Sequence, residues 1–155
     1  MKSFFQALTL GILAGMASLI TFLSDLPTWI LFLGWTSYFL FGQKTKSFFY
    51  VYTQQLIGVL LAILIIYLGN FLSERLGSQW FHCSVFVILF SVFYVTKLKV
   101  FNDLTAYFLG MIIWFGLATD PTLEKILIVA VTLFTGFLSG WINLNLNKRI
   151  ETKLK

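Results

Sequence analysis

The sequence predicts an all-α integral membrane protein whose six transmembrane helices form two inverted three-helix repeats, with both termini in the cytoplasm. Hydrophobic residues make up 59% of the chain and charged residues 11%, whereas soluble domains have about 45–50% and about 25%. So much apolar surface cannot be buried inside a globule of 155 residues. In addition, the charges fall between apolar segments, and two similar stretches lie about half a chain apart. These observations indicate that lipid is the main solvent.

Six apolar segments account for the predicted helices. They are Phe4–Leu23, Leu26–Gly42, Phe48–Phe71, Trp80–Thr96, Asn102–Ala118 and Leu123–Ile142. A spanning helix needs about 20 residues and at least roughly 17, so the second, fourth and fifth segments have the minimum length. A cleaved signal peptide is an alternative for the first segment, because Lys2 precedes an apolar stretch that contains Ala14 and Ala17. The stretch continues to Leu23 and five more segments follow, which favours a membrane helix.

Basic residues predict the orientation of the segments. If the N-terminus is cytoplasmic, the cytoplasmic side holds Lys2, Lys44, Lys46, Lys97, Lys99, Lys148, Arg149, Lys153 and Lys155. The other side holds only Arg75 and Lys125. Cytoplasmic loops of membrane proteins carry an excess of Lys and Arg. The pattern therefore predicts a multi-pass protein with both termini inside, and the net charge of +5 indicates topology rather than nucleic-acid binding.

Two similar stretches lie in the middle of the second and fifth segments. FLGWTSYF begins at residue 32 and FLGMIIWF begins at residue 108, 76 residues later. The repeated glycines are Gly34 and Gly110. In the predicted topology the second segment runs from outside to inside and the fifth from inside to outside. Both glycines are therefore expected near the bilayer midplane, on antiparallel helices.

The third and sixth segments share a small-residue pattern. Gly58 and Ala62 are four residues apart in the third segment, and Gly136 and Gly140 have the same spacing in the sixth, 78 residues later. The first and fourth segments show no comparable match.

A single membrane domain of residues 1–155 is predicted, built from one repeat at about 4–71 and a second at about 80–147. Because each repeat contains three spans, the second repeat must be inverted relative to the first. In many transporters, inverted repeats place the substrate path near the midplane, where the halves meet. We therefore expect the two halves to meet at Gly34 and Gly110.

Three stretches resemble a known family: GILAG at 11–15, FLGWTSYFLFG at 32–42 and FLGMIIWFG at 108–116. The chain resembles the YcdZ-type family of small bacterial inner-membrane proteins, catalogued as domain of unknown function 1097. The resemblance covers nearly the whole chain in order and spacing, and it consists of glycine and aromatic positions rather than a catalytic signature. It implies a polytopic protein of the bacterial inner (plasma) membrane, without an established activity.

Side chains suited to catalysis or metal binding are scarce. His82 and Cys83 are adjacent at the start of the fourth segment, and no further ligand or orienting group stands at a suitable spacing. We interpret His82 as an interfacial residue beside Trp80. No glycine-rich phosphate loop with a following Lys is present. The sequence therefore predicts no enzyme, no metal and no cofactor.

Small residues spaced by four predict close contacts between helices. They are Gly11, Gly15, Gly58, Ala62, Gly136 and Gly140. In lipid, such residues let two backbones approach and pack by dispersion and weak hydrogen bonds. The pattern leaves open whether the contacts lie within one chain or between copies. We expect a homo-oligomer, since six short helices enclose little volume.

Candidate residues for a solute path surround the two midplane glycines. They are Gly34, Thr36, Ser37, Tyr38, Gly110 and Trp114. Polar groups inside spans tend to face the bundle or a water-filled path, and this set is polar in one half and apolar in the other. We therefore predict a channel or facilitative transporter for a small, weakly polar solute. In the alternative interpretation, Thr36 and Ser37 donate to carbonyls of the preceding turn and line nothing.

Three further polar residues lie near the inner surface and are candidates for polar contacts or proton coupling. Gln54 and Gln55 open the third segment, where interhelical hydrogen bonds are their default role. Asp103 is a candidate for proton coupling if it lies deep, although Lys99 stands four positions earlier and favours an interfacial ion pair. Two other functions therefore remain open: a non-transporting membrane scaffold that binds a partner, and a proton-coupled secondary transporter.

Overall fold

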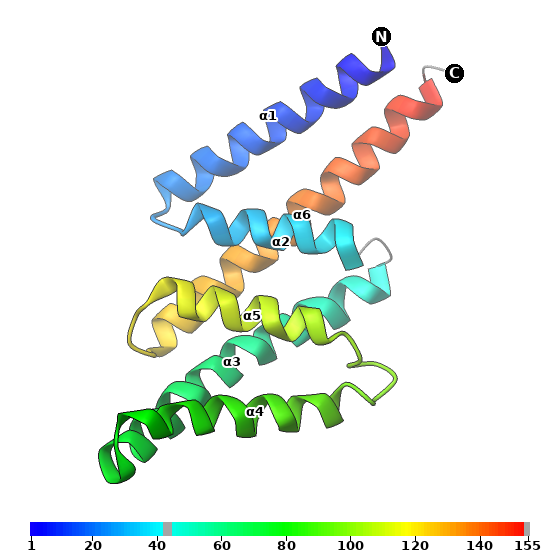
Figure 1. Cartoon of the computed structure of the whole chain (residues 1–155). Coiled ribbons are helices and arrows are strands. Elements are labelled where there is room, and N and C mark those ends of the chain that lie inside the picture. Colours follow the sequence, from blue (N-terminus) through cyan, green and yellow to red (C-terminus); the bar gives the residue numbers. More distant parts are fainter. Residues whose placement is uncertain (42–44, 154–155) are drawn as a thin grey trace. The chain divides into compact units, whose positions relative to one another are not determined.

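The computed structural model describes residues 1–41 and 45–153, and these residues fold into helices joined by short connections (Figure 1). The elements are α1 (Lys2–Leu23), α2 (Thr28–Phe41), α3 (Thr45–Leu76), the 3₁₀ helix η1 (Ser78–Trp80), α4 (Phe81–Val95), α5 (Leu104–Leu117) and α6 (Leu123–Lys153). Each of the six predicted apolar segments thus contains a helix, although the ends of some segments are not helical. The predicted end of the second segment at Gly42, and the side chains of Lys44, Lys46 and Lys155, lie outside the described residues.

Helix lengths separate the elements into two groups. Four helical stretches in the described chain are long and apolar enough to cross a bilayer: Lys2–Leu23, Ser47–Leu76, Ser78–Val95 and Leu123–Lys153. In contrast, α2 and α5 have 14 residues each, which corresponds to about 21 Å at 1.5 Å per residue. They are therefore shorter than the segments predicted for them. Asp103 caps the start of α5, and Ala118 ends it in the left-handed region at φ 46°.

The chain divides into two compact units, and each contains helices from both halves of the sequence. Unit 1 comprises Met1–Phe48 and Leu127–Lys155, so it contains α1, α2 and most of α6. α1 and α2 form a hairpin, whose turn is held by a 2.8 Å hydrogen bond between the hydroxyls of Thr21 and Thr28. α1 also reaches the far end of α6, where the Gln6 amide donates to the Glu151 carboxylate at 3.2 Å. The two chain ends therefore lie close together.

Unit 2 comprises Phe49–Ile126 and contains most of α3 together with η1, α4 and α5. The Phe81 ring of α4 lies directly against Gly69 of α3. The Ser84 hydroxyl donates to the Ile65 carbonyl at 3.1 Å and joins the same two helices. Each unit therefore consists of a helical hairpin that packs on one long helix from the opposite half of the sequence.

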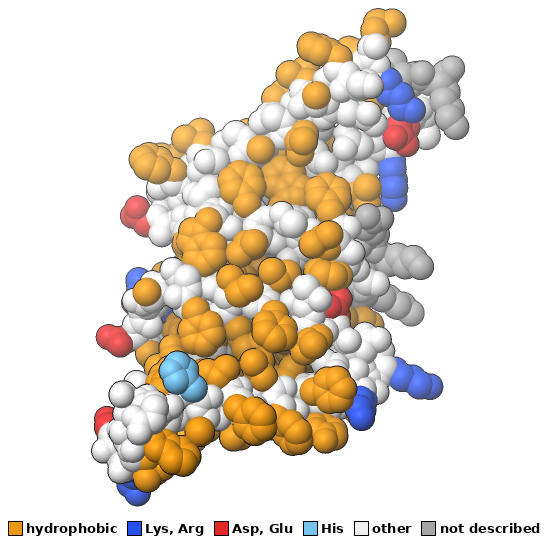
Figure 2. All heavy atoms as spheres, viewed as in Figure 1, with side chains coloured by type: hydrophobic (Ala, Val, Ile, Leu, Met, Phe, Trp, Pro, Cys, Tyr) orange, Lys and Arg blue, Asp and Glu red, His pale blue; other side chains and the backbone are white. Residues whose placement is uncertain are grey.

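Large hydrophobic side chains are exposed along the helices of each unit (Figure 2). On α4 they form a continuous aromatic row, in which Phe86 stacks on Phe90 at 5.9 Å and Phe90 meets Tyr94 edge-on at 5.3 Å. Soluble monomers rarely expose contiguous apolar surfaces of this kind. Together with the long apolar helices, these surfaces characterise a membrane-type helical protein.

Candidate functional site

Unit 1 is centred on a close crossing of α2 and α6. A Cβ atom added to Gly34 would lie 3.2 Å from the Cα atom of Gly136 and would clash with the Leu133 carbonyl oxygen. A Cβ atom added to Gly136 would lie 2.9 Å from the backbone nitrogen of Trp35 and would clash with the Leu31 carbonyl oxygen. The opposing atoms belong to the backbone and cannot rotate away. Only glycine on both helices permits this approach.

Unit 2 contains a second crossing of the same kind, between α5 and α3. A Cβ atom on Gly110 would lie 2.9 Å from the Cα atom of Gly58 and would clash with the Gln55 carbonyl oxygen. A Cβ atom on Gly58 would lie 3.0 Å from the Cα atom of Gly110 and would clash with the Tyr107 carbonyl oxygen. We refer to the two contacts as the α2–α6 crossing and the α5–α3 crossing.

The two crossings use corresponding positions of the sequence. Gly34 and Gly110 are 76 residues apart, as are Leu31 and Tyr107, whose carbonyls face the partner glycine. On the long helices the separation is 78, both for the glycines and for Gln55 and Leu133. The meeting of Gly34 with Gly110 at the midplane stays a prediction, because the two glycines belong to different units. Each of these glycines packs against the glycine of a long helix in its own unit.

The buried faces of the helices follow the same numbering. The buried residues of α2 are Ile30, Leu31, Gly34, Trp35, Ser37 and Tyr38. The buried residues of α5 are Ala106, Tyr107, Gly110, Met111, Ile113 and Trp114, each 76 positions later. In α6 they are Val129, Thr132, Leu133, Gly136, Phe137, Gly140 and Asn143. Each of these has a buried counterpart 78 positions earlier in α3, which also buries Phe48, Ile63 and Gly69.

The other small residues divide into packed and unpacked positions. Gly140 lies against the Tyr38 side chain, and a Cβ atom added to Gly140 would be 2.9 Å from the Cβ atom of Tyr38. Ala62 is fully buried. By contrast, a Cβ atom added to Gly11 or Gly15 would meet nothing within 4 Å in the described chain. Within the residues that the structure describes, the first-segment pair therefore makes no close packing contact, unlike the pairs of the third and sixth segments.

The predicted polar patch on α2 is divided between two faces. Ser37 is buried, and its hydroxyl donates to the Leu33 carbonyl at 2.7 Å, as the alternative interpretation expected. Thr36 is exposed, and its hydroxyl makes no hydrogen bond within the part of the chain that the structure describes. Tyr38 and Trp114 are buried on the crossing faces of their helices. Of this patch, Thr36 lines an open space in the described structure.

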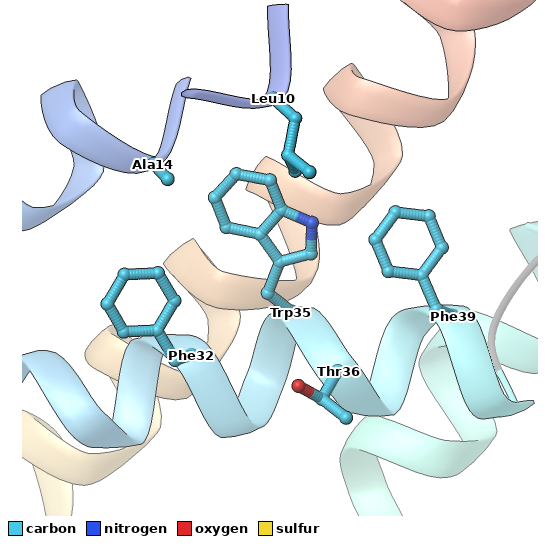
Figure 3. Close-up of a pocket in the computed structure, with 6 residues that line it drawn as sticks. All are labelled: Leu10, Ala14, Phe32, Trp35, Thr36 and Phe39. Atoms are coloured by element: carbon cyan, nitrogen blue, oxygen red, sulfur yellow. The ribbon is translucent and has the colours of Figure 1, made fainter. Parts of the chain in front are cut away.

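That space is a groove between α1 and α2 in unit 1 (Figure 3). Its volume is about 220 Å³, and its lining residues are Leu10, Ala14, Phe32, Trp35, Thr36 and Phe39. Figure 3 shows the Trp35 indole between the rings of Phe32 and Phe39, with Leu10 and Ala14 above it on α1 and Thr36 pointing away. The Phe32 ring stacks on Trp35 at 6.3 Å. Except for Thr36 and the indole nitrogen, the lining is apolar.

The sequence interpretation did not select Trp35 or its aromatic neighbours. A Trp in the middle of an apolar helix was a usable signal, because Trp is enriched at membrane interfaces rather than at mid-depth. The side chain is 5% exposed, and its Nε1 atom is buried without a hydrogen-bond partner. Buried indole N–H groups usually have a partner, so this one requires an explanation.

Other buried polar atoms without partners lie elsewhere in the described chain. They are Nε1 of Trp114 in unit 2, and Nδ2 of Asn143 and Oδ1 of Asn147 on α6. The two asparagines bond to each other through their remaining amide atoms at 3.2 Å. None of these three residues lines the groove.

The polar residues predicted near the inner surface fix the start of α5 in unit 2. The Gln54 side chain is 2% exposed, donates to the Tyr50 carbonyl, and accepts the Asp103 backbone N–H at 2.9 Å. The Asp103 carboxylate accepts the N–H groups of Thr105 and Ala106 at 3.1 and 3.3 Å, so it is the N-cap of α5. Gln55 is buried, and its backbone carbonyl faces Gly110 at the α5–α3 crossing.

His82 and Cys83 lie at the start of α4, where His82 is exposed beside the Phe81 ring and Cys83 is a free thiol. Among the described residues, no three His, Cys, Asp or Glu side chains gather in a way that would hold a metal ion.

The fold and the outward apolar surfaces define a helical membrane-type protein whose described site is an apolar groove. A family model, described as protein of unknown function (DUF1097), matches residues 7–147. The chain belongs to this family. No curated protein and no solved structure matches the chain.

Proposed function

We propose that this protein is a six-span channel or facilitative transporter of the bacterial inner membrane that carries a small, weakly polar solute. The proposal is supported by one observation above all. The buried faces of α2 and α5, and of α3 and α6, correspond position by position around two equivalent glycine crossings.

This correspondence supports two inverted repeats that exchange helices. The first repeat supplies α1, α2 and α3, and the second supplies α4, α5 and α6. In each unit, the hairpin of one repeat packs on the long helix of the other. In the proposal, this exchange of helices joins the two repeats into a single membrane domain. Inverted repeats are a recurrent architecture of membrane transporters.

The short helices α2 and α5 are proposed to cross the hydrocarbon core, which is about 30 Å thick. Each covers about 21 Å by itself, and the connections at 24–27 and 96–103 would lie in the interface. Mismatch of this size is accommodated by local thinning of the bilayer or by flanking residues. The basic residues Lys97 and Lys99 then stay on the cytoplasmic side, as the charge pattern predicts.

The lining of the groove indicates which kind of solute would bind there. Its aromatic lining and its exposed Thr36 hydroxyl suit a small molecule with one or two polar atoms. A hydrated ion would require a ring of carbonyls or charged groups instead. The Asp103 carboxylate is engaged as a helix cap, which favours facilitated diffusion over proton coupling.

Permeability measurements on liposomes test the proposal. Stopped-flow light scattering would compare liposomes with and without the purified protein, using acetamide, glycerol and acetic acid as solutes. We expect faster re-swelling for at least one solute, and slower flux in Thr36→Val, which replaces the hydroxyl by a methyl group of similar size. Thr135→Val is the matched control, because Thr135 on α6 is half-buried, does not line the groove, and its hydroxyl donates to the Val131 carbonyl. Permeability equal to that of empty liposomes for every solute contradicts the proposal.

A membrane scaffold that binds a protein partner is the second candidate. The backbone contacts at the two crossings favour it, since they leave no space between the paired helices. A scaffold would leave every solute flux at the background value, while affinity purification from cross-linked membranes would recover one stoichiometric partner.

A further inference from the structure

The most informative unexplained group in the structure is the indole N–H of Trp35. Two indole nitrogens are buried without a hydrogen-bond partner in the described chain, those of Trp35 and Trp114. Of these two, Trp35 lines the groove between α1 and α2, and Trp114 does not line it. In Figure 3 the nitrogen-bearing edge of its ring faces Phe39, inside the ring of groove-lining side chains. The groove therefore combines an apolar wall with one orphaned donor.

Water does not account for this donor. A buried water molecule needs two to four polar partners, and the groove offers only the indole N–H and the Thr36 hydroxyl. Figure 3 shows the Thr36 side chain pointing away from the indole, so these two groups do not converge on one site. An acyl chain fills apolar space but carries no hydrogen-bond acceptor along its hydrocarbon. The missing partner is an acceptor on an otherwise apolar molecule.

We propose that the groove binds a small, mainly apolar molecule that carries one hydrogen-bond acceptor, and that the Trp35 N–H donates to that acceptor. The volume of about 220 Å³ exceeds that of the engineered cavity of about 150 Å³ that binds benzene, so an aromatic ring with a short carbonyl substituent is of suitable size. Because Nε1 is buried in the structure, the acceptor reaches it only when a neighbouring side chain moves aside. The inference names the solute class of the proposed transporter and places its binding site, so it rests on the proposed function for its biological meaning.

Indole NMR with a matched pair of probes tests the inference. The protein would be labelled with ¹⁵N in its tryptophan indoles, held in lipid nanodiscs, and titrated with acetophenone or with α-methylstyrene. The two probes have nearly the same shape, and only acetophenone carries a carbonyl oxygen. The cross-peaks of Trp35 and Trp114 would be assigned by their loss in Trp35→Phe and Trp114→Phe.

Acetophenone is expected to move the Trp35 indole proton downfield in a saturable manner, while α-methylstyrene gives no downfield shift. Trp114 is the internal control, because its buried indole lies outside the groove, and its peak should not move. Ala14→Leu, which fills the groove from α1 and keeps the indole, should abolish the shift. Thr135→Val changes a hydroxyl outside the groove lining and should leave the midpoint of the titration unchanged.

Three outcomes overturn the inference: a Trp35 peak that does not move, equal shifts with both probes, or a Trp114 shift as large as that of Trp35. Equal shifts would mean that the groove accepts any apolar chain, including a lipid acyl chain, without using the N–H. The titration reads binding alone, so a negative flux measurement does not decide it. Likewise, a failed titration would not contradict a measured solute flux. It would exclude only this binding site and this class of solute.

Discussion

Gly34 of α2 and Gly136 of α6 lie so close that a Cβ atom on Gly34 would be 3.2 Å from the Cα atom of Gly136. The equivalent pair, Gly110 and Gly58, brings α5 and α3 together in unit 2. In lipid, no hydrophobic driving force pulls helices together, so contact distance decides their association. The two crossings therefore hold the long helices to the hairpins. The first prediction concerns the effect of alanine at these glycines on stability.

Alanine at any crossing glycine should lower the thermal stability of the detergent-solubilised protein. In Gly34→Ala and in Gly110→Ala the new methyl group meets backbone carbonyls that cannot rotate away. Overpacking of this kind costs about 1–3 kcal/mol and sometimes more. The change would be measured as the midpoint of thermal unfolding by circular dichroism and by loss of monodisperse protein on size exclusion.

Gly11→Ala is the matched control for the crossing variants. Gly11 is also a helical glycine, but a Cβ atom there meets nothing within 4 Å in the described chain. Alanine has the higher helix propensity by about 1 kcal/mol, so the variant should be as stable as the parent or slightly more stable. Equal losses at Gly11 and at Gly34 would show that the close approach at the crossings does not govern stability.

Hydrophobic pattern alone was sufficient to predict the helices, but not their lengths. The third and sixth segments were assigned to Phe48–Phe71 and Leu123–Ile142, whereas α3 runs to Leu76 and α6 to Lys153. Both helices continue through polar residues, because no proline or glycine lies between the predicted end and the observed end of either helix. A hydropathy pattern marks where the lipid ends, whereas α3 and α6 extend beyond that point.

The partners of the glycines could not be predicted from the repeat. Spacing identified Gly34 with Gly110, and Gly58 with Gly136, as equivalent positions. Equivalence says that two residues have similar surroundings, and it does not say that they touch. In the structure each glycine pairs with the non-equivalent one of its unit. The groove was also out of reach, since Trp35 becomes part of a site only when α1 is placed over it.

A cross-link between the chain ends tests the composition of unit 1. Gln6 and Glu151 are 145 positions apart and share a hydrogen bond at 3.2 Å. In a Cys83→Ser background, Gln6→Cys with Glu151→Cys should react with a short bis-maleimide to give an intramolecular product, identified by mass spectrometry after proteolysis. Arg149→Cys replaces Glu151→Cys in the control, because two residues along an α-helix turn the side chain to the opposite face. Equal yields from the two pairs would contradict the arrangement of α1 and α6 in the structure.

Asp103→Asn separates a helix cap from a proton-coupling residue. Asn is about as good an N-cap as Asp, and its side-chain oxygen can accept the same N–H groups of Thr105 and Ala106. We therefore expect little change in stability or in solute flux. Asp103→Ala should lose about 1 kcal/mol of stability, since it removes the cap. Loss of flux in Asp103→Asn with unchanged thermal stability would instead support proton coupling.

Removal of the Gln54 amide should cost more than removal of an exposed polar group. Gln54 is nearly fully buried and accepts the Asp103 backbone N–H. Gln54→Leu leaves that N–H without its partner, at a cost of about 1–3 kcal/mol. Thr53→Val is the control one residue earlier, because the Thr53 hydroxyl is exposed and only donates to the Phe49 carbonyl. Unfolding midpoints of the two variants in the same detergent give the comparison.

The number of spans can be decided by the accessibility of Glu74 and Lys99. Both side chains are exposed, one near the end of α3 and the other between α4 and α5. If α2 and α5 cross the membrane, Glu74 is outside and Lys99 is in the cytoplasm. If only the four long helical stretches cross, both assignments reverse, because α3 and α4 then run in the opposite directions. In a Cys83→Ser background, an impermeant maleimide applied to spheroplasts should label Glu74→Cys and spare Lys99→Cys until the cells are lysed. Labelling of Lys99→Cys alone in intact spheroplasts would exclude six spans, and with them the inverted repeats on which the transport proposal depends.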